Sequence, residues 1–253
     1  MSWRVLIIGH TGGIGKALVV ECRQAGWWVM GASRQPALKS VDVDTALAID
    51  ITLPKDRERL IDAVVECRIN VVVFAAGTPH FAETSSVCDE DLTSVLACNL
   101  LAPMAVTSGL LRVRSESLSL STVLYIGSAV GDIGLPGYSV YGASKSGLHR
   151  YVESLRRETA GQGVAFKLLV PRATKTNFNS AAATAYGTAT GAGSDTPQSV
   201  AKAALRLIHS NQLTLSLGQA ESLFAKLNLL FGARLDGAFK KHSIALRGLK
   251  LPL

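Results

Sequence analysis

The fold of this chain is decided by the stretch Gly9-His10-Thr11-Gly12-Gly13-Ile14-Gly15-Lys16. An apolar, β-branched run at residues 5–8 precedes this stretch, and residues 17–20 begin a helical pattern after it. Glycines between a strand and a helix allow a tight turn, and they let backbone N–H groups at the helix N-terminus approach a phosphate. The turn therefore predicts a dinucleotide ligand. The alternative interpretation is an ordinary strand-to-helix turn.

Short apolar runs of the same kind recur along the chain, each followed by Gly, Asp or Pro and mostly by a helical pattern. We expect strands at residues 5–8, 28–32, 46–49, 71–75, 123–126, 164–170 and 213–217, and helices at 13–25, 54–67, 89–111, 138–160 and 197–210. Continuous apolar strands are typical of a parallel sheet covered on both faces, with right-handed crossovers. The pattern predicts an α/β fold with three αβα layers: a single domain, residues 1–253, around a doubly wound parallel sheet.

The composition is that of a globular protein and excludes disorder as the overall state. Of the 253 residues 48% are apolar and 18% are charged, and the charged share is below the roughly 25% usual for soluble domains. We therefore expect much of the chain to be buried in a core or an oligomer interface. The net charge of +7 is compatible with anionic ligands or surfaces but selects none of them.

The cysteines and histidines predict neither disulfides nor a metal site. The four cysteines form no C-x-x-C pair, and the five histidines show no H-x-x-x-H spacing. We expect reduced thiols and a cytoplasmic protein. The apolar run at the N-terminus is too short for a signal peptide, and no apolar run approaches the roughly 18 residues of a membrane-spanning helix. Because no nucleic-acid-binding motif is present, we expect no nucleic-acid partner.

The spacing of the glycines in the turn fits two patterns. Gly9, Gly13 and Gly15 match G-x-x-x-G-x-G, which resembles the short-chain dehydrogenase/reductase family. Gly9, Gly12 and Gly15 match G-x-x-G-x-x-G, which resembles the longer epimerase and dehydratase branch of that family. The chain length favours the shorter dehydrogenase branch, and the resemblance covers roughly residues 3–217. It implies a Rossmann-type sheet with a nicotinamide cofactor.

A second strand ends at Ser33-Arg34, where an enzyme that prefers NAD usually places an acid on the ribose hydroxyls. A guanidinium there can bind a 2′-phosphate through charge-assisted hydrogen bonds, so NADP(H) is favoured over NAD(H). Asp50 matches the acid that contacts adenine in the family, and its alternative role is that of a turn residue. The resemblance assigns cofactor contacts to Gly9, Thr11, Gly12, Gly13, Ile14, Gly15, Ser33, Arg34, Asp50, Ile51, Ala75, Ala76, Gly77, Tyr141, Lys145, Pro171, Thr174 and Thr176.

Two segments depart from the family pattern. Phe74-Ala75-Ala76-Gly77 stands where the family usually has Asn-Asn-Ala-Gly, which puts the bracing of the sheet by the missing asparagines in doubt. Arg172 replaces the glycine of the segment P-G-x-x-x-T, in which Thr176 matches the cofactor-holding threonine. The arginine side chain has two open interpretations: it crowds the nicotinamide end of the site, or it meets an anionic substrate.

Tyr141 and Lys145 stand at i and i+4, on one face of an expected helix. A free tyrosine titrates near pH 10, and an adjacent cation lowers this pKa by stabilising the phenolate. Ser128, thirteen residues before Tyr141, and Asn99 match the family's carbonyl-orienting serine and the asparagine that bends a helix and anchors a water. The resemblance therefore implies Asn99, Ser128, Tyr141 and Lys145 as the catalytic residues.

Two segments near the C-terminus do not follow the β-α alternation. Residues 177–196 are rich in small residues and lack an apolar period, so we expect a mobile substrate loop that can act as a lid. From residue 220 onward the net charge is +4, and apolar residues recur at helical spacing. We expect the apolar face of this tail to pack on the subunit or on a neighbour. Peripheral membrane contact and cover of the active site are the less favoured alternatives.

The expected organisation is a cofactor half at residues 1–135, a catalytic helix and substrate loop at 136–217, and an amphipathic tail at 218–253. The leading hypothesis is an NADPH-dependent carbonyl reductase or, in reverse, a secondary-alcohol dehydrogenase. A non-catalytic NADP-binding scaffold that acts through the basic tail is the alternative, and a nucleotide-sugar epimerase or dehydratase is less favoured. The substrate is expected to be a small carbonyl compound or alcohol, apolar or bulky, and the family resemblance implies a homodimer or homotetramer.

Overall fold

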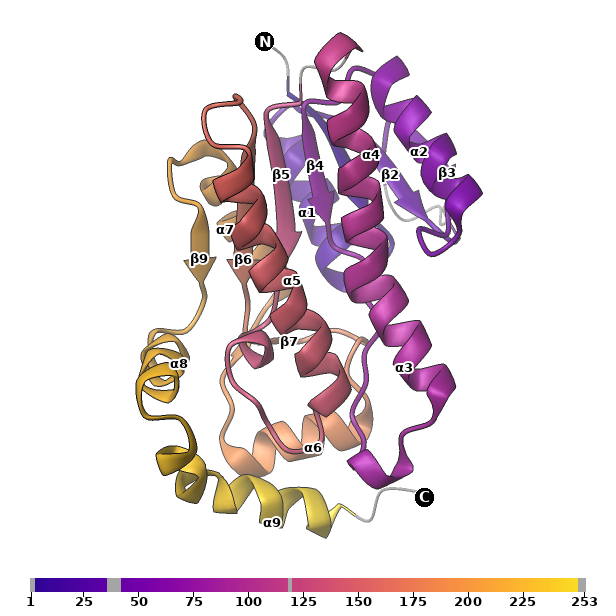
Figure 1. Ribbon diagram of the computed structural model, residues 1–253. Helices are drawn as coiled ribbons and strands as arrows, with labels where there is room; N and C mark the ends of the chain where they lie inside the picture. The colour runs from indigo at the N-terminus through magenta and orange to yellow at the C-terminus, as the bar shows by residue number, and fades with distance from the viewer. Residues whose placement is uncertain (1–2, 36–41, 118–119, 250–253) are drawn as a thin grey trace.

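A computed structural model of the protein describes residues 3–35, 42–117 and 120–249 (Figure 1). Seven parallel strands form one sheet in the order β3-β2-β1-β4-β5-β6-β9. The strands are β1 Arg4–Ile8, β2 Trp28–Ser33, β3 Thr45–Ala48, β4 Val71–Phe74, β5 Thr122–Ile126, β6 Ala165–Val170 and β9 Thr214–Ser216. The order reverses between β1 and β4, as expected of a doubly wound sheet.

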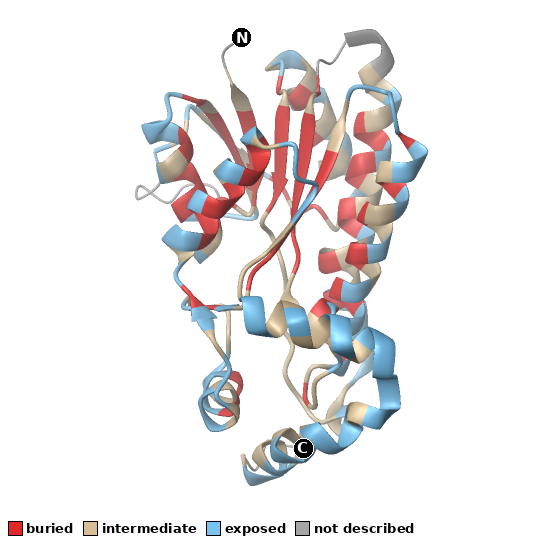
Figure 2. Ribbon diagram, turned by 90° about the vertical axis from the view of Figure 1, so that its left-hand side faces the viewer, coloured by how far each residue is buried: buried red, intermediate tan, exposed pale blue. Residues whose placement is uncertain are grey.

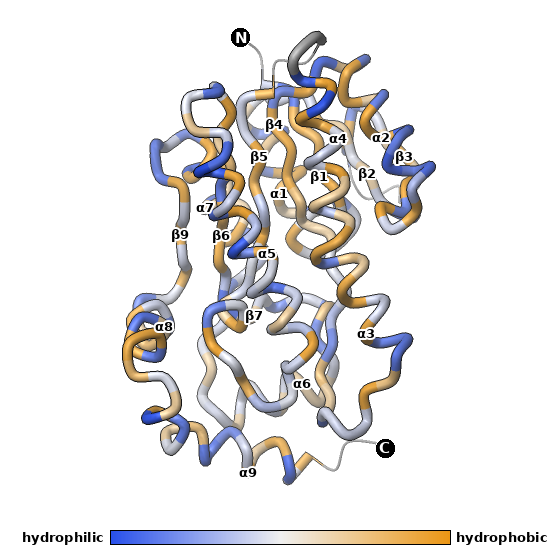
Figure 3. The backbone as a smooth tube through the Cα atoms, in the orientation of Figure 1, coloured by the Kyte–Doolittle hydropathy of each residue, from blue (hydrophilic) through white to orange (hydrophobic). Residues whose placement is uncertain are grey.

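Helices cover both faces of the sheet and form the two outer layers. The helices of the αβα body are α1 Gly13–Gln24, α2 Pro54–Glu66, α3 Asp89–Leu96, α4 Ala102–Ser117, α5 Ser139–Glu158 and α7 Pro197–His209. Val5 and Ile7 of β1 pack in one apolar cluster with α1 and α7, and Leu6 and Ile8 pack in the other with α2, α4 and α5. Because both faces are covered, the central strands are hydrophobic along their length (Figure 3).

The strand predictions are confirmed, each within one residue of its observed bounds. The expected helix at 89–111 is longer and is interrupted, because a π-helical turn, η2 Ala97–Leu101, lies between α3 and α4. Taken together, Asp89–Arg114 is long and apolar enough to cross a membrane by length and composition alone. The expectation that no segment would meet this test is therefore wrong. Val106 and Leu110 of this helix are fully buried against the sheet, as in a core helix.

The expectation of a loop at residues 177–196 is also wrong. The segment contains α6 Ala181–Thr190 and β8 Ser194–Asp195, which pairs with β7 Ala173–Thr174. Ser180 caps the helix by accepting a 3.1 Å hydrogen bond from the Ala183 N–H, and Gly191 ends it at a φ of 76°. Alanine favours helices intrinsically, so a helix forms here without an amphipathic apolar stripe.

The tail forms three consecutive helical segments, α8 Gln219–Phe231, η4 Gly232–Phe239 and α9 Lys240–Gly248, along one side and the lower end of the molecule (Figure 1). Figure 2 shows these segments largely exposed, whereas the strands are buried. None of their described residues is buried. The expected packing of the tail on its own subunit therefore holds only for a few inward side chains. Short 3-10 turns at η1 Thr84–Ser86 and η3 Ala129–Gly131 complete the described elements.

Candidate active site

A cavity of about 2070 Å³ opens at the carboxyl ends of the strands. Its walls come from the segments that follow strands β1 to β6 and from α3, and α6 with the tail helices lines another side. Ligands of open α/β sheets bind at this edge, where the strand order reverses. The cavity collects the predicted catalytic residues Ser128, Tyr141 and Lys145, and every predicted cofactor residue except Gly15 borders it.

The glycine turn is built so that side chains are excluded from one wall of the cavity. Gly9 has a φ of 89°, and a Cβ atom there would lie 2.5 Å from the Ala76 nitrogen. A Cβ atom at Gly13 would overlap the Thr176 side chain, and one at Gly15 would overlap the Gly9 carbonyl oxygen. At Gly12 the nearest atom would be 3.4 Å away, which is an ordinary contact. Backbone atoms therefore exclude a side chain at 9 and 15, and the Thr176 side chain opposes one at 13, which is the spacing of the shorter branch.

The far end of the cavity is shaped for a polar ligand. Among the described residues, the Ser33 Oγ is a buried oxygen that has no hydrogen-bond partner within the protein. Arg34 is exposed beside it and borders the cavity. Asp50 accepts hydrogen bonds from the Thr52 N–H at 2.9 Å and the Thr52 hydroxyl at 2.6 Å, so it closes the turn after β3 as well as lining the cavity. Neither position 33 nor position 34 carries an acid.

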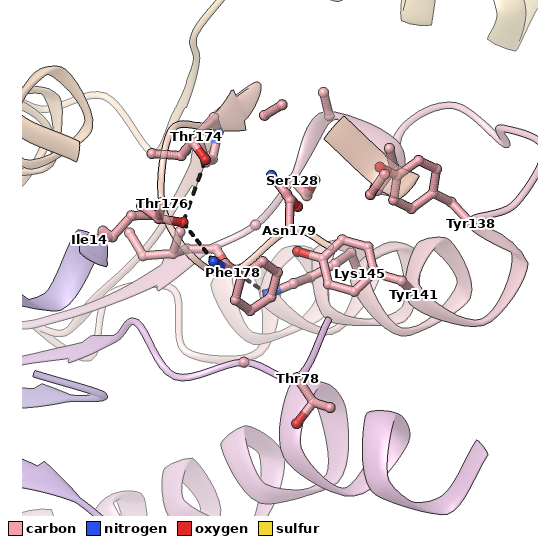
Figure 4. A pocket seen from close by; sticks show the side chains of 18 of the residues that line it. Ile14, Thr78, Ser128, Tyr138, Tyr141, Lys145, Thr174, Thr176, Phe178 and Asn179 are labelled. Atoms are coloured by element: carbon pink, nitrogen blue, oxygen red, sulfur yellow. Dashed lines mark hydrogen bonds between the residues drawn. The ribbon is translucent and has the colours of Figure 1, made fainter. Parts of the chain in front are cut away.

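Figure 4 shows Ser128, Tyr141 and Lys145 converging on one part of the cavity. The Tyr141 phenol forms a hydrogen bond with the Ser128 side chain. The Lys145 Nζ donates to the Ile126 carbonyl oxygen at 3.0 Å and lies 5.7 Å from the centroid of the Tyr141 ring. Helix α5 places both side chains on this wall because they are one turn apart.

Burial has the largest effect on the pKa values of Tyr141 and Lys145. Desolvation raises the pKa of Tyr141 well above its usual value, and the hydrogen bond to Ser128 acts in the opposite direction. Desolvation also lowers the pKa of Lys145 to about 8. The expectation that Lys145 lowers the pKa of Tyr141 stays a prediction. In this structure the ammonium group donates to the Ile126 carbonyl, and the shift of the Tyr141 pKa comes mainly from loss of hydration.

Asn99 lies in the π-helical turn η2 and is buried. Its side chain accepts from the Thr78 N–H at 2.8 Å and donates to the Thr78 carbonyl at 3.0 Å and to the Ser144 hydroxyl at 3.1 Å. Ser144 in turn donates to the Tyr141 carbonyl at 2.7 Å. Asn99 therefore joins the loop after β4 to the catalytic helix. Its role in anchoring a water stays a prediction.

A histidine that was not predicted as a site residue lies beneath the loop that carries Ser128. The His149 Nδ1 lies 2.9 Å from a carboxylate oxygen of Asp132, and its Nε2 accepts from the Ser128 N–H at 3.4 Å. A Cβ atom at Gly127 or Gly131 would collide with this ring. The available signal was spacing: His149 follows Lys145 by four residues and shares its face of α5.

Arg172 borders the cavity, and its side chain is engaged in an ion pair, while its two expected roles toward ligands stay predictions. Its main-chain N–H, Nε and Nη2 donate to the buried Asp195 carboxylate at 2.9, 3.2 and 2.7 Å, and its Nη1 lies 3.9 Å from Glu221. The guanidinium thus ties the segment after β6 to β8 and α8. Thr176 in the same segment accepts from the Phe178 N–H at 3.2 Å. The pair with Asp195 had no signal in the sequence, because the two residues are 23 positions apart.

The remaining wall of the cavity is aromatic. Tyr186 contacts Phe81, Tyr138 and His242, and its hydroxyl lies 2.8 Å from the His242 Nδ1. Phe178 packs edge-on against the Tyr141 ring. Among the described residues, no group of His, Cys, Asp and Glu could hold a metal ion. The cavity therefore joins an acid-base pair to a surface suited to apolar ligands.

Comparison with known proteins decides the family. The profile described as "short chain dehydrogenase" matches residues 4–187. The chain belongs to the short-chain dehydrogenase family. The dehydrogenase is thus an NAD(P)-dependent oxidoreductase, which favours an enzyme over the scaffold alternative.

Two curated relatives of the dehydrogenase are reductases. The 3-oxoacyl-(acyl-carrier-protein) reductase FabG of Haemophilus influenzae is 26% identical over 174 residues, covering 66% of this chain and 72% of the relative. Carbonyl reductase family member 4 of Xenopus laevis is 27% identical over 187 residues, covering 71% and 79%. A short-chain dehydrogenase structure from Burkholderia cenocepacia in complex with NADP has a TM-score of 0.81 at 16% identity, covering 94% and 98% of the two chains. That likeness establishes the fold.

The site of the dehydrogenase fits a nicotinamide dinucleotide. The glycine turn keeps side chains away from the cavity wall at the N-terminus of α1, where backbone N–H groups favour a pyrophosphate. The buried Ser33 hydroxyl borders the same cavity and has no hydrogen-bond partner within the protein, so it is available to a polar ligand. The catalytic pair lines another part of the same cavity. These observations come from the chain itself and agree with the family.

Proposed function

We propose that the protein is an NADPH-dependent reductase of an apolar ketone or aldehyde, or in reverse a dehydrogenase of the corresponding alcohol. The observation that carries the proposal is one cavity that joins Ser128, Tyr141 and Lys145 to Arg34. NADPH, when bound, supplies the hydride. Arg34 and Ser33 would hold the adenosine end, with the 2′-phosphate on the guanidinium, and Thr174 and Thr176 would line the nicotinamide end.

The protein supplies the proton and holds the substrate oxygen. Ser128 donates a hydrogen bond to the carbonyl oxygen, and Tyr141 donates a proton to the same oxygen as it becomes an alcohol. The ordinary pKa of a phenol is near 10 and burial raises that of Tyr141 further, so the phenol is protonated at neutral pH and carries the proton that reduction needs. Lys145 on the same wall is placed to stabilise the phenolate that the step leaves behind.

The substrate class is inferred from the aromatic wall that adjoins Tyr141. Tyr138, Phe178, Tyr186, Phe224 and Phe239 border the cavity and leave it mostly apolar there. Apolar and aromatic groups gain most from transfer to such a surface. A homodimer or homotetramer and a cytoplasmic location remain part of the proposal.

Cofactor preference is tested by titrating the protein with NADPH and NADH and following nucleotide fluorescence. Loss of a charge-assisted hydrogen bond costs about 1.5–3 kcal/mol, so Arg34→Ala should weaken NADPH binding roughly 10- to 150-fold and leave NADH binding nearly unchanged. Arg112→Ala, an exposed arginine outside the cavity, is the matched control. Equal NADPH affinity in Arg34→Ala and the wild type would refute the assigned role of Arg34.

Catalysis is tested with a panel of hydrophobic ketones and aldehydes, by the loss of NADPH absorbance. Tyr141→Phe should bind NADPH normally and lose at least about 100-fold in turnover, because general acid catalysis contributes about 10²–10⁴-fold. Tyr151→Phe removes a hydroxyl from the same helix that donates to the Met104 carbonyl, and it should keep wild-type turnover. Retained activity in Tyr141→Phe would overturn the mechanism.

A further inference from the structure

The arm formed by α8, η4 and α9 (residues 219–248) leaves much apolar surface uncovered. The described chain has eleven exposed large hydrophobic side chains, and six of them lie in this arm: Leu223, Leu227, Leu229, Leu230, Phe231 and Ile244. Leu229 is 87% exposed and Leu230 is 75% exposed. Apolar surface gathered in this way on one element marks an interaction site.

The inward side chains of the arm contact the body of the protein or border the cavity. Phe224, Phe239 and His242 border the cavity, and the rings of Phe224 and Phe239 contact each other. His242 reaches Tyr186 of α6, and the Lys241 Nζ donates to the Thr190 carbonyl at 3.2 Å. These contacts attach the arm to the body through one side. The exposed leucines and Ile244 do not border the cavity, and these solvent-facing side chains form the outward side of the arm.

Basic residues are interleaved with the outward apolar ones. Leu223, Leu227 and Leu230 stand at i, i+4 and i+7, so they form one stripe along α8, and Lys226 lies beside it. Figure 3 shows the resulting mixture of strongly hydrophobic and hydrophilic positions in α8. In α9, Ile244 is flanked at helical spacing by Lys240 and Arg247.

The net charge of the arm is positive. Lys226, Arg234, Lys240, Lys241 and Arg247 are exposed, and the acids of the arm are Glu221 and Asp236. Glu221 lies 3.9 Å from Arg172, so its charge is partly compensated. A second copy of this chain seated on the arm by a two-fold axis would bring like charges together, which opposes association. An anionic lipid surface has the opposite charge and an apolar interior.

We propose that the arm docks on an anionic lipid surface. Exposed leucines, Phe231 and Ile244 enter the boundary between headgroups and acyl chains, and the flanking lysines and arginines contact the anionic headgroups. Lysine beside an apolar stripe can lay its stem along the apolar surface and keep its charge among the headgroups. The proposal does not depend on the substrate of the enzyme, since it concerns the outward side of the arm.

The test is co-sedimentation of the full chain with vesicles of phosphatidylcholine alone and of phosphatidylcholine with phosphatidylglycerol. We expect binding to the anionic vesicles and little binding to the neutral ones. Binding to the anionic vesicles should weaken in 0.5 M NaCl, because at such ionic strength the Debye screening length lies between about 3 and 10 Å. Lys226→Glu/Lys240→Glu should reduce binding about tenfold or more. Leu229→Glu/Leu230→Glu should abolish it. Val20→Glu, which places the same charge at an exposed apolar position of α1, is the matched control and should bind as the wild type does.

Each variant is also tested for NADPH binding and for mass by light scattering, so that misfolding and changes of assembly are separated from loss of lipid contact. Loss of vesicle binding with normal NADPH binding and unchanged mass supports the proposal. Two outcomes overturn it: the wild type does not sediment with anionic vesicles, or the arm variants sediment with them as much as the wild type does. If the wild type binds no vesicles and the arm variants form a smaller assembly, the arm is assigned instead to contact between copies of the chain.

Discussion

Lys145 should destabilise the folded protein at neutral pH, because its charged side chain is buried in the wall of the cavity and has lost most of its hydration. Burial lowers its pKa from the ordinary 10.5 to about 8, a difference that corresponds to about 3 kcal/mol at 1.36 kcal/mol per pH unit. Its Nζ makes one hydrogen bond, to the Ile126 carbonyl, worth about 1 kcal/mol. Lys145→Met should therefore stabilise the protein by about 2 kcal/mol at pH 7, a rise of about 4–8 °C in Tm.

The dependence on pH isolates the charge from changes in packing. Below pH 8 the lysine is protonated in both the folded and the unfolded wild type, so the stability difference between variant and wild type is constant. Between pH 8 and 10.5 the unfolded chain binds the extra proton, and the wild-type stability rises with pH. The advantage of Lys145→Met should shrink by about 3 kcal/mol across this window. The assay is urea denaturation of both proteins without nucleotide, at steps from pH 7 to pH 10.5.

A second buried lysine supplies the control. The Lys167 Nζ donates to the carbonyl oxygens of Leu207, Ile208 and Ser210, where α7 ends. Lys167→Met leaves these carbonyls without their donor and should destabilise the protein by about 1–3 kcal/mol at pH 7. A stability difference for Lys145→Met that stays flat from pH 7 to 10.5 would refute the reasoning, as would a loss of stability at pH 7 equal to that of Lys167→Met.

Three further predictions follow from contacts of the site. His149→Ala removes the acceptor of the Ser128 N–H and the partner of Asp132. This variant should lower kcat by about 10-fold or more with nearly unchanged NADPH affinity. An unchanged kcat would mean that His149 does not position Ser128. Asp195→Ala should lower the free energy of unfolding, measured by urea denaturation, by about 1.5–3 kcal/mol, because three donors of Arg172 lose their acceptor. Glu221→Ala should lower it by less than about 0.5 kcal/mol, because the Glu221 carboxylate lies 3.9 Å from the Arg172 guanidinium. Equal losses would contradict this ranking. Gly13→Ala should weaken NADPH binding about tenfold by displacing the Thr176 side chain, and Thr176→Ser in the same chain should restore part of it, because serine lacks the methyl group but keeps the Cβ atom 2.8 Å from the added carbon. No rescue in fluorescence titration would show that the collision is not the cause.

The sequence by itself determined the sheet and the chemistry of its loops. Strand and turn patterns are local, so the apolar run at residues 5–8 and the glycines after it identify β1 and the phosphate turn without any knowledge of their neighbours. The spacing of Tyr141 and Lys145 is likewise a property of one helix. Ser128 and Asn99 are predicted because their order and context resemble the family. The structure brings Ser128, Tyr141 and Lys145 to one cavity, and Asn99 is linked to their helix through Ser144.

Only the tertiary structure decided what depends on contacts between distant segments. The guanidinium of Arg172 has a role because β7 and β8 pair and bring Asp195 to it, and no local pattern encodes that pairing. The pKa values of Tyr141 and Lys145 are set by loss of water around them, which spacing cannot reveal. The same holds for the arm at residues 219–248. The helical spacing of its apolar residues is visible in the sequence. Whether a side chain is buried depends on which other segments pack against it, and the fold leaves Leu229 and Leu230 exposed to solvent.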